Sequence, residues 1–170
     1  MELKTISPRN FTTDIINLWE KRWLLLTSGD FKSGNFNTMT VAWGSIGQMW
    51  NKPFVQAVVR PTRYTFEFME KYDTFTLCAF PDEYKPALNL LGSKSGRDGD
   101  KIAETNLNVM QSSVVAAPSF KEADLIIECK KIYWDDFKPE NFLVPEIDNN
   151  YKLKDYHRVY FGEILAIRQA

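Results

Sequence analysis

A short segment in the first half of the chain combines the side chains that bind phosphate groups. The apolar run Phe54–Val59 leads into R-P-T-R-Y-T (residues 60–65), and residues 66–71 then have the composition of a helix. Two guanidinium groups offer planar donor pairs to phosphate oxygens, and the first N–H groups of a helix favour an anion. The segment therefore predicts an anion site. An ordinary strand-to-helix turn, with the arginines solvated or paired with Glu67 and Glu70, would have the same sequence.

A glycine-rich loop provides a second candidate for anion binding. Residues 92–101 contain three glycines together with hydroxyl and cationic side chains. Exposed backbone amides, hydroxyls and cations are the groups that cradle an anion. For this loop taken alone, the favoured interpretation is a solvated turn in which Asp98 and Asp100 balance Arg97 and Lys101.

The segment N-T-M-T-V-A-W-G (residues 37–44) alternates polar and apolar residues as a strand does. The alternation places Asn37, Met39, Val41 and Trp43 on one face and Thr38, Thr40 and Ala42 on the other. A half-buried strand explains this pattern as well as a binding surface does. In the functional interpretation, small or hydroxyl-bearing side chains and strand-end amides lie against a flat heterocycle.

Other candidate catalytic groups are few. His157 is the only histidine, and its position before an apolar run favours a structural hydrogen-bonding role. The sequence has no Ser/His/Asp pattern, HExxH, Walker loop or GxGxxG fingerprint, so hydrolase and kinase functions lack support. Cys78 and Cys129 lie in separate apolar runs, which predicts buried, reduced thiols rather than a metal or redox pair.

Length and charge limit the class of protein. A chain of 170 residues is the size of one domain, and we predict a single domain over residues 1–170. With 21 basic and 22 acidic residues the net charge is -1, which makes nucleic acid an unexpected partner. No segment has the length of a membrane span or the apolar core of a signal peptide, so we expect no membrane association and a cytoplasmic protein. Aromatic residues form 14% of the chain, enough for a planar ligand pocket or a dimer interface with Trp19, Trp50 or Trp134 exposed.

The elements that must position these residues are mainly β. Apolar runs rich in β-branched and aromatic residues predict six strands, at residues 23–27, 38–43, 54–60, 75–80, 125–133 and 159–167. Helices are expected at residues 13–21, 64–71 and 83–91, with a short turn at 100–105. Because only one strand leads directly into a helix, a parallel doubly wound sheet is disfavoured and a small closed barrel is favoured. Residues 30–37 are expected to form a long loop, and residues 136–154 an excursion from the barrel.

The ordered motifs resemble those of a known family. They are N-T-M-T-V-A-W, W-N-K-P-F, V-R-P-T-R-Y-T-F-E-F, D-T-F-T-L, S-G-R-D-x-D-K followed by I-A-E-T, and H-x-x-x-x-G-E-I. Together they span residues 37–164 and are similar to the flavin reductase-like FMN-binding split-barrel family, most of all to its flavoredoxin-type branch. The resemblance implies a six-stranded antiparallel split barrel with a few peripheral helices, a homodimer, and FMN held noncovalently near the subunit interface.

The resemblance also implies which residues bind the cofactor. Those expected to face the isoalloxazine and ribityl groups are Asn37, Thr38, Met39, Thr40, Ala42 and Trp43. Those expected to hold the phosphate are Arg60, Arg63, Tyr64 and Thr65. Those expected to close over the cofactor are Ser95, Gly96, Arg97 and Lys101. The sequence departs from the family at Gly99, commonly apolar, and at Ala42, often serine, and residues 136–154 match nothing in the pattern.

The implied activity is electron transfer from NAD(P)H through FMN to free flavin or another acceptor. The flavin would carry the redox chemistry, so no protein nucleophile or catalytic residue is assigned, and His157 is given no catalytic role. Because there is no separate dinucleotide-binding domain, NAD(P)H would bind only transiently over the flavin. Two alternatives remain: a flavoredoxin-like electron carrier reduced by a redox protein partner, and a non-enzymatic flavin-binding barrel.

Overall fold

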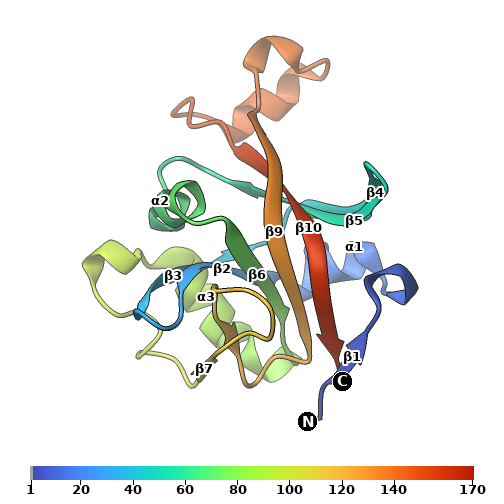
Figure 1. Ribbon diagram of the computed structural model, residues 1–170. Helices are drawn as coiled ribbons and strands as arrows, with labels where there is room; N and C mark the ends of the chain where they lie inside the picture. Colours follow the sequence, from blue (N-terminus) through green and yellow to red (C-terminus); the bar gives the residue numbers. More distant parts are fainter. Residues whose placement is uncertain (1) are drawn as a thin grey trace.

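The computed structural model describes residues 2–170, and one curled antiparallel sheet dominates it (Figure 1). Its eight strands are β1 (Lys4–Ile6), β2 (Leu24–Asp30), β3 (Asn35–Val41), β4 (Gly44–Met49), β5 (Lys52–Val59), β6 (Thr74–Ala79), β9 (Leu125–Asp136) and β10 (Arg158–Gln169). A separate two-stranded ribbon pairs β7 (Val109–Met110) with β8 (Ser119–Phe120). All pairings are antiparallel, which confirms the predicted mainly β class.

The sheet is a barrel that stays open between two edge strands. Its strand order is β3-β2-β6-β9-β10-β5-β4, with β1 added to β10, and within residues 2–170 no ladder joins β3 to β4. The two sides of the sheet nevertheless share one core, since Met39 of β3, Leu77 of β6 and Val55 of β5 belong to the same buried cluster. The long strands β9 and β10 run the full height of the barrel and bend at two register shifts. The split-barrel prediction is confirmed, with eight strands rather than six.

The strand that sequence patterning missed most clearly is β4. It carries Gly44 and Gly47, is largely exposed, and returns into β5 through Trp50 and Asn51, whose φ angles are 52° and 60°. Two consecutive residues with positive φ form the type I′ hairpin turn, which normally uses Asn-Gly. Because Trp-Asn is an unusual sequence for that turn, composition did not indicate the hairpin.

Three α-helices pack around the sheet. Helix α2 (Tyr64–Lys71) follows β5 directly and has the predicted bounds. Helix α3 (Lys85–Ser93) is preceded by a 3-10 turn. It packs on the face of β3 that carries Thr40, whose Oγ1 donates to Leu88 O at 2.5 Å. The helix expected at residues 13–21 is shorter, because α1 (Ile15–Asn17) widens at once into a π-helical turn, Leu18–Arg22.

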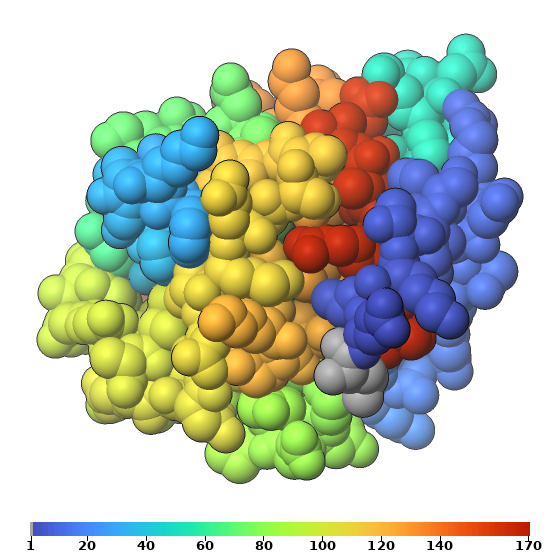
Figure 2. All heavy atoms as spheres, turned by 60° about the horizontal axis from the view of Figure 1, so that its bottom comes forward, coloured from blue at the N-terminus to red at the C-terminus, as the bar shows by residue number. Residues whose placement is uncertain are grey.

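One connection is shorter than expected, and another is fixed to the sheet by a buried carboxylate. Residues 30–37 form a tight hairpin rather than a long loop, since Asp30 pairs with Asn35 in the β2–β3 ladder. Figure 2 shows the segment around residues 111–118, in yellow, lying across the lower face of the barrel. Glu128, fully buried, accepts hydrogen bonds from the backbone N–H groups of Ser113 and Val114 at 2.9 and 2.7 Å, which fixes this segment to the sheet.

Residues 137–157 connect β9 to β10, and residues 137–156 of this connection form a separate cap above the barrel (Figure 1). The cap contains two 3-10 turns, Pro139–Asn141 and Pro145–Asn150, so the expected excursion has ordered local structure. Among residues 2–170 no helix is long and apolar enough to cross a bilayer.

The tryptophans and cysteines show how burial decides the role of each residue. Trp50 and Trp134 are about half exposed, whereas Trp19 is buried in the main core, so the expectation that Trp19 is exposed is wrong. Cys78 and Cys129 are buried and free, and burial raises the pKa of the Cys78 thiol to about 12. Both thiols are therefore packing groups.

Candidate functional site

A cleft follows β3 along the open edge of the barrel. It consists of two adjoining cavities, of about 70 and 220 Å³, that share Met39. The smaller, here called the basic end, lies between the first turn of α2 and the loop after α3. It is lined by Asn37, Met39, Thr62, Arg63, Tyr64, Thr65, Ser93, Lys94, Ser95, Gly96 and Lys101. The larger, here called the aromatic end, is lined by Met39, Thr40, Val41, Ala42, Trp43, Val58, Arg60 and His157.

Two cations without carboxylate partners define the basic end. Arg63 donates to the carbonyl of Gly92, and Lys101 Nζ donates to the carbonyls of Leu91 and Lys94 at 2.7 and 3.0 Å. Within residues 2–170 neither cation forms a salt bridge, whereas Arg60 and Lys94, which also line the cleft, pair with Asp155 and Glu104. Burial, and then the neighbouring Arg63 charge, lower the pKa of Lys101 to about 8, and burial and Arg60 lower the pKa of Arg63. An anion bound here would relieve this unfavourable accumulation of positive charge.

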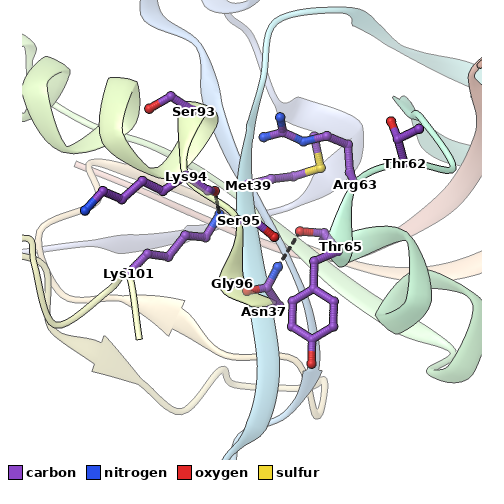
Figure 3. A pocket seen from close by; sticks show the side chains of 11 residues that line it. Asn37, Met39, Thr62, Arg63, Thr65, Ser93, Lys94, Ser95, Gly96 and Lys101 are labelled. Carbon is purple, nitrogen blue, oxygen red and sulfur yellow. Dashed lines mark hydrogen bonds between the residues drawn. The ribbon is translucent and has the colours of Figure 1, made fainter. Parts of the chain in front are cut away.

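The backbone around these cations is held close together, as Figure 3 shows. Asn37 Nδ2 donates to Thr65 Oγ1 at 2.7 Å and so ties β3 to the first turn of α2. Helix α2 has no side-chain cap at its N-terminus, where the helix dipole favours an anion. A Cβ atom on Gly96 would lie 2.3 Å from Asn37 Oδ1, so only glycine allows the loop to approach β3 this closely.

Two cations of the loop after α3, Lys94 and Arg97, pair with carboxylates outside the loop. Arg97 pairs with Glu67 of α2 at 2.5 Å and lies over the Tyr64 ring, and Lys94 pairs with Glu104. The expected balance of Asp98 and Asp100 against Arg97 and Lys101 is therefore wrong. Asp100 Oδ1 instead accepts hydrogen bonds from the backbone of residues 102 and 103, because an aspartate at a turn reaches the amides that follow it.

The aromatic end is nearly neutral because the cap engages its arginine. The Arg60 guanidinium donates to both carboxylate oxygens of Asp155 at 3.0 Å and to the Asn150 carbonyl at 2.8 Å. Trp43, about half exposed, lies with its ring centroid 5.3 Å from that of His157. Burial, followed by the Arg60 charge, lowers the pKa of His157 to about 4.

The structure brings together most of the residues that the sequence singled out. Those at the basic end are Asn37, Met39, Arg63, Tyr64, Thr65, Ser95, Gly96 and Lys101, and those at the aromatic end are Thr40, Ala42, Trp43 and Arg60. Thr38 lines neither cavity, because its buried hydroxyl bonds to Thr27 Oγ1 and the Leu26 carbonyl. Arg97 lies outside both linings and holds the loop to α2. Arg60 lies apart from the basic end, where the phosphate prediction had placed it with Arg63.

Several lining residues were not among the predicted site residues. Thr62, Ser93 and Lys94 lie beside predicted positions, so their neighbourhood was the available signal. Val58 and His157 reach the aromatic end only because β5 and β10 pair, with Val59 opposite Arg158. No local pattern indicates that a cap residue would engage Arg60.

The fold and the cleft define a class: an antiparallel split barrel with an amphipathic cleft, cationic at one end and aromatic at the other, along its open edge. The chain belongs to the flavin reductase like domain family, whose model matches residues 21–169. The family resemblance of the sequence is thereby confirmed.

Individual relatives are distant. An uncharacterised protein of Pyrococcus abyssi is 26% identical over 152 residues, which are 88% of this chain and 74% of that protein. An FMN-binding domain of a flavin reductases-like enzyme from Shewanella baltica superposes with a TM-score of 0.71 at 16% identity, covering 99% of this chain and 77% of that one. Flavoredoxin of Desulfovibrio vulgaris gives a TM-score of 0.68 at 21% identity, covering 94% and 74%. These structural likenesses establish the shared fold.

Proposed function

We propose that the cleft binds FMN, with the phosphate at the basic end and the isoalloxazine ring toward the aromatic end. The observation that carries this proposal is the pair of cations, partly buried Arg63 and buried Lys101, for which residues 2–170 provide no carboxylate partner. The cavity volumes support the orientation, because about 70 Å³ suits a phosphate group and about 220 Å³ begins to accommodate a ring system.

The residues present fit such a ligand. Arg63 and Lys101 would neutralise the phosphate, while Thr65, Ser95 and the amides of the α2 start would donate hydrogen bonds. Gly96 permits the loop to approach β3, and Trp43 and Val58 provide apolar walls for a planar ring. A bound flavin supplies the hydride and electron chemistry, and the chain contributes position, polarity and exclusion of water.

The proposed activity is that of an NAD(P)H-dependent, flavin reductase-like oxidoreductase. The family description supports a reductase. The second candidate is an electron carrier reduced by a protein donor, suggested by the fold shared with a flavoredoxin.

FMN binding is tested by fluorescence titration of the purified protein. The wild-type chain is expected to bind FMN at micromolar concentration or below, and Arg63→Ala to weaken binding at least tenfold, since a lost charge-assisted hydrogen bond costs about 1.5–3 kcal/mol. Arg9→Ala is the matched control, because Arg9 also donates to a backbone carbonyl, that of Asn51, but lies away from the cleft. Equal affinities of Arg63→Ala and wild type would refute the phosphate assignment.

The electron donor is tested by mixing the FMN-loaded protein anaerobically with NADH or NADPH in a stopped-flow spectrophotometer. Bleaching of the flavin absorbance within the time of turnover is expected for a reductase. Unchanged absorbance, with reduction by a low-potential ferredoxin, would instead establish the carrier function.

The same proposal includes a homodimer. Trp50 and Tyr133 are 55% and 45% exposed and form an aromatic surface with Phe161 on the outer face of the barrel. Trp134, 51% exposed, instead packs against Arg158, whose guanidinium lies 3.8 Å from its ring centroid. Exposed aromatic clusters of this kind are typical of subunit interfaces.

A further inference from the structure

The cap carries a small aromatic core of its own directly above the cleft. The rings of Phe142 and Tyr151 stack at 6.0 Å with an interplanar angle of 8°, and the ring of Tyr156 lies 4.9 Å from that of Tyr151. Tyr151 is 2% exposed, and its hydroxyl oxygen lies 2.8 Å from Nδ1 of His157. A segment that the sequence motifs did not explain thus contacts the only histidine of the chain.

The direction of this hydrogen bond follows from burial. The hydrogen of a buried tyrosine hydroxyl normally has an acceptor, and within residues 2–170 the only partner of the Tyr151 hydroxyl is His157 Nδ1. Nδ1 therefore accepts, and a neutral imidazole that accepts at Nδ1 carries its proton on Nε2. The lower pKa of His157 keeps the ring neutral, because burial and Arg60 outweigh the opposing charge of Asp155.

The cap also determines which polar groups remain free at the aromatic end. It consumes the Arg60 guanidinium through Asp155 and Asn150, so the nearest cation does not point at the cleft as a free donor. His157 lines the cleft beside Trp43, and in the described chain its Nε2 has no hydrogen-bond partner. The cap thus leaves one neutral N–H donor beside an apolar wall.

We propose that Tyr151 is a positioning residue that sets the Nε2–H tautomer of His157, and that His157 donates this hydrogen bond to a carbonyl or ring-nitrogen acceptor of the planar heteroaromatic ligand in the cleft. The ligand part of this inference rests on the proposed flavin-binding function. The tautomer part depends only on contacts within the chain.

The tautomer is tested by long-range ¹H–¹⁵N NMR of the ¹⁵N-labelled protein without flavin. Because the chain has a single histidine, its imidazole signals need no assignment. Wild type is expected to show an accepting Nδ1 and a protonated Nε2, and Tyr151→Phe to show a mixture or the opposite tautomer. The matched control is Tyr156→Phe, which removes another cap hydroxyl, one that donates to Asp148 at 2.7 Å. The same tautomer in wild type and Tyr151→Phe would overturn the inference.

The ligand contact is tested with riboflavin, which has the ring but no phosphate and so isolates the aromatic end. Tyr151→Phe is expected to weaken riboflavin binding roughly two- to tenfold, the range of one net hydrogen bond, while Tyr156→Phe binds as wild type does. His157→Gln, which can place an amide N–H near the Nε2 position, is expected to retain more affinity than His157→Leu.

The outcomes separate the two proposals. Wild-type affinity for riboflavin in both Tyr151→Phe and His157→Leu would overturn the ligand contact while leaving FMN binding established. Failure of wild type to bind any flavin would instead refute the proposed function and the ligand contact together, and the NMR result would still decide the tautomer. If Tyr151→Phe does not fold, the two His157 variants provide the ligand test.

Discussion

Lys101 offers the sharpest test of how the basic end works. The residue is 4% exposed, its ammonium donates to two carbonyls at the end of α3, and its pKa is lowered to about 8, first by burial and then by Arg63. The perturbation is a change of pH from 7 to 9, over which the phosphate of FMN remains a dianion while Lys101 loses its proton. A phosphate close to Lys101 would raise the pKa of Lys101 again by about 1–3 units.

The magnitude follows from linkage. In the free protein about nine-tenths of Lys101 is protonated at pH 7 and about one-tenth at pH 9, so FMN affinity should fall up to about tenfold, or ~1.4 kcal/mol. The free energy of unfolding should respond to pH at Lys101 in the opposite direction to FMN affinity. Between pH 8 and 10.5 the unfolded chain holds more protons at this residue than the folded chain, so the contribution of Lys101 to the free energy of unfolding rises with pH.

The assay is FMN fluorescence titration at constant ionic strength from pH 7 to 9, with riboflavin as the matched ligand. Wild type should lose FMN affinity above pH 8, whereas Lys101→Met should bind FMN weakly at all these pH values, and riboflavin binding should be flat for both. A fall in FMN affinity of the same size in Lys101→Met would show that another group titrates and would refute this reasoning.

Three further changes test the cap, the core and the outer surface. Asp155→Ala should lower the free energy of unfolding in urea by about 1–3 kcal/mol, because it removes the carboxylate partner of half-buried Arg60. The control Asp135→Ala removes an exposed ion pair and should change the free energy of unfolding by less than about 1 kcal/mol. Equal effects of the two substitutions would contradict the role of the cap contact. Gly162→Ala should lower the thermal midpoint of unfolding, with a loss of about 1–3 kcal/mol in the free energy of unfolding, because the new Cβ would lie 2.5 Å from Phe75 Cζ in the core. An unchanged midpoint would show that the Phe75 ring moves aside without cost. Trp50→Asp should convert the proposed dimer to monomer in sedimentation velocity, and a dimer that persists would place the interface elsewhere.

Local sequence patterns predicted the buried strands and the helices that follow directly from them. β5 and β6 are rich in apolar and β-branched residues, most of which are buried. Helix α2 begins where a proline turn ends and has an amphipathic face, so in all three elements residue propensity and burial favour the same structure. β4 was missed because its residues are largely exposed and its turn uses Trp50 and Asn51. Its pairing with β5 is decided by backbone geometry rather than by side-chain pattern.

The candidate site likewise has features that local sequence patterns predict and features that only long-range contacts decide. By itself, the sequence determined the chemistry of the basic end, because Arg63, Tyr64 and Thr65 are adjacent at a strand-to-helix junction and the glycine-rich loop carries its own cations and hydroxyls. Tertiary structure alone decided which cations are free. Arg60 and Asp155 are separated by 94 intervening residues in the sequence. Only strand pairing and the path of the cap bring the Arg60 guanidinium to 3.0 Å from the Asp155 carboxylate. The charge of a site depends on long-range partners that local patterns do not encode. Three-dimensional contacts therefore decide that Asp155 neutralises Arg60, whereas Arg63 and Lys101 have no carboxylate partner among residues 2–170.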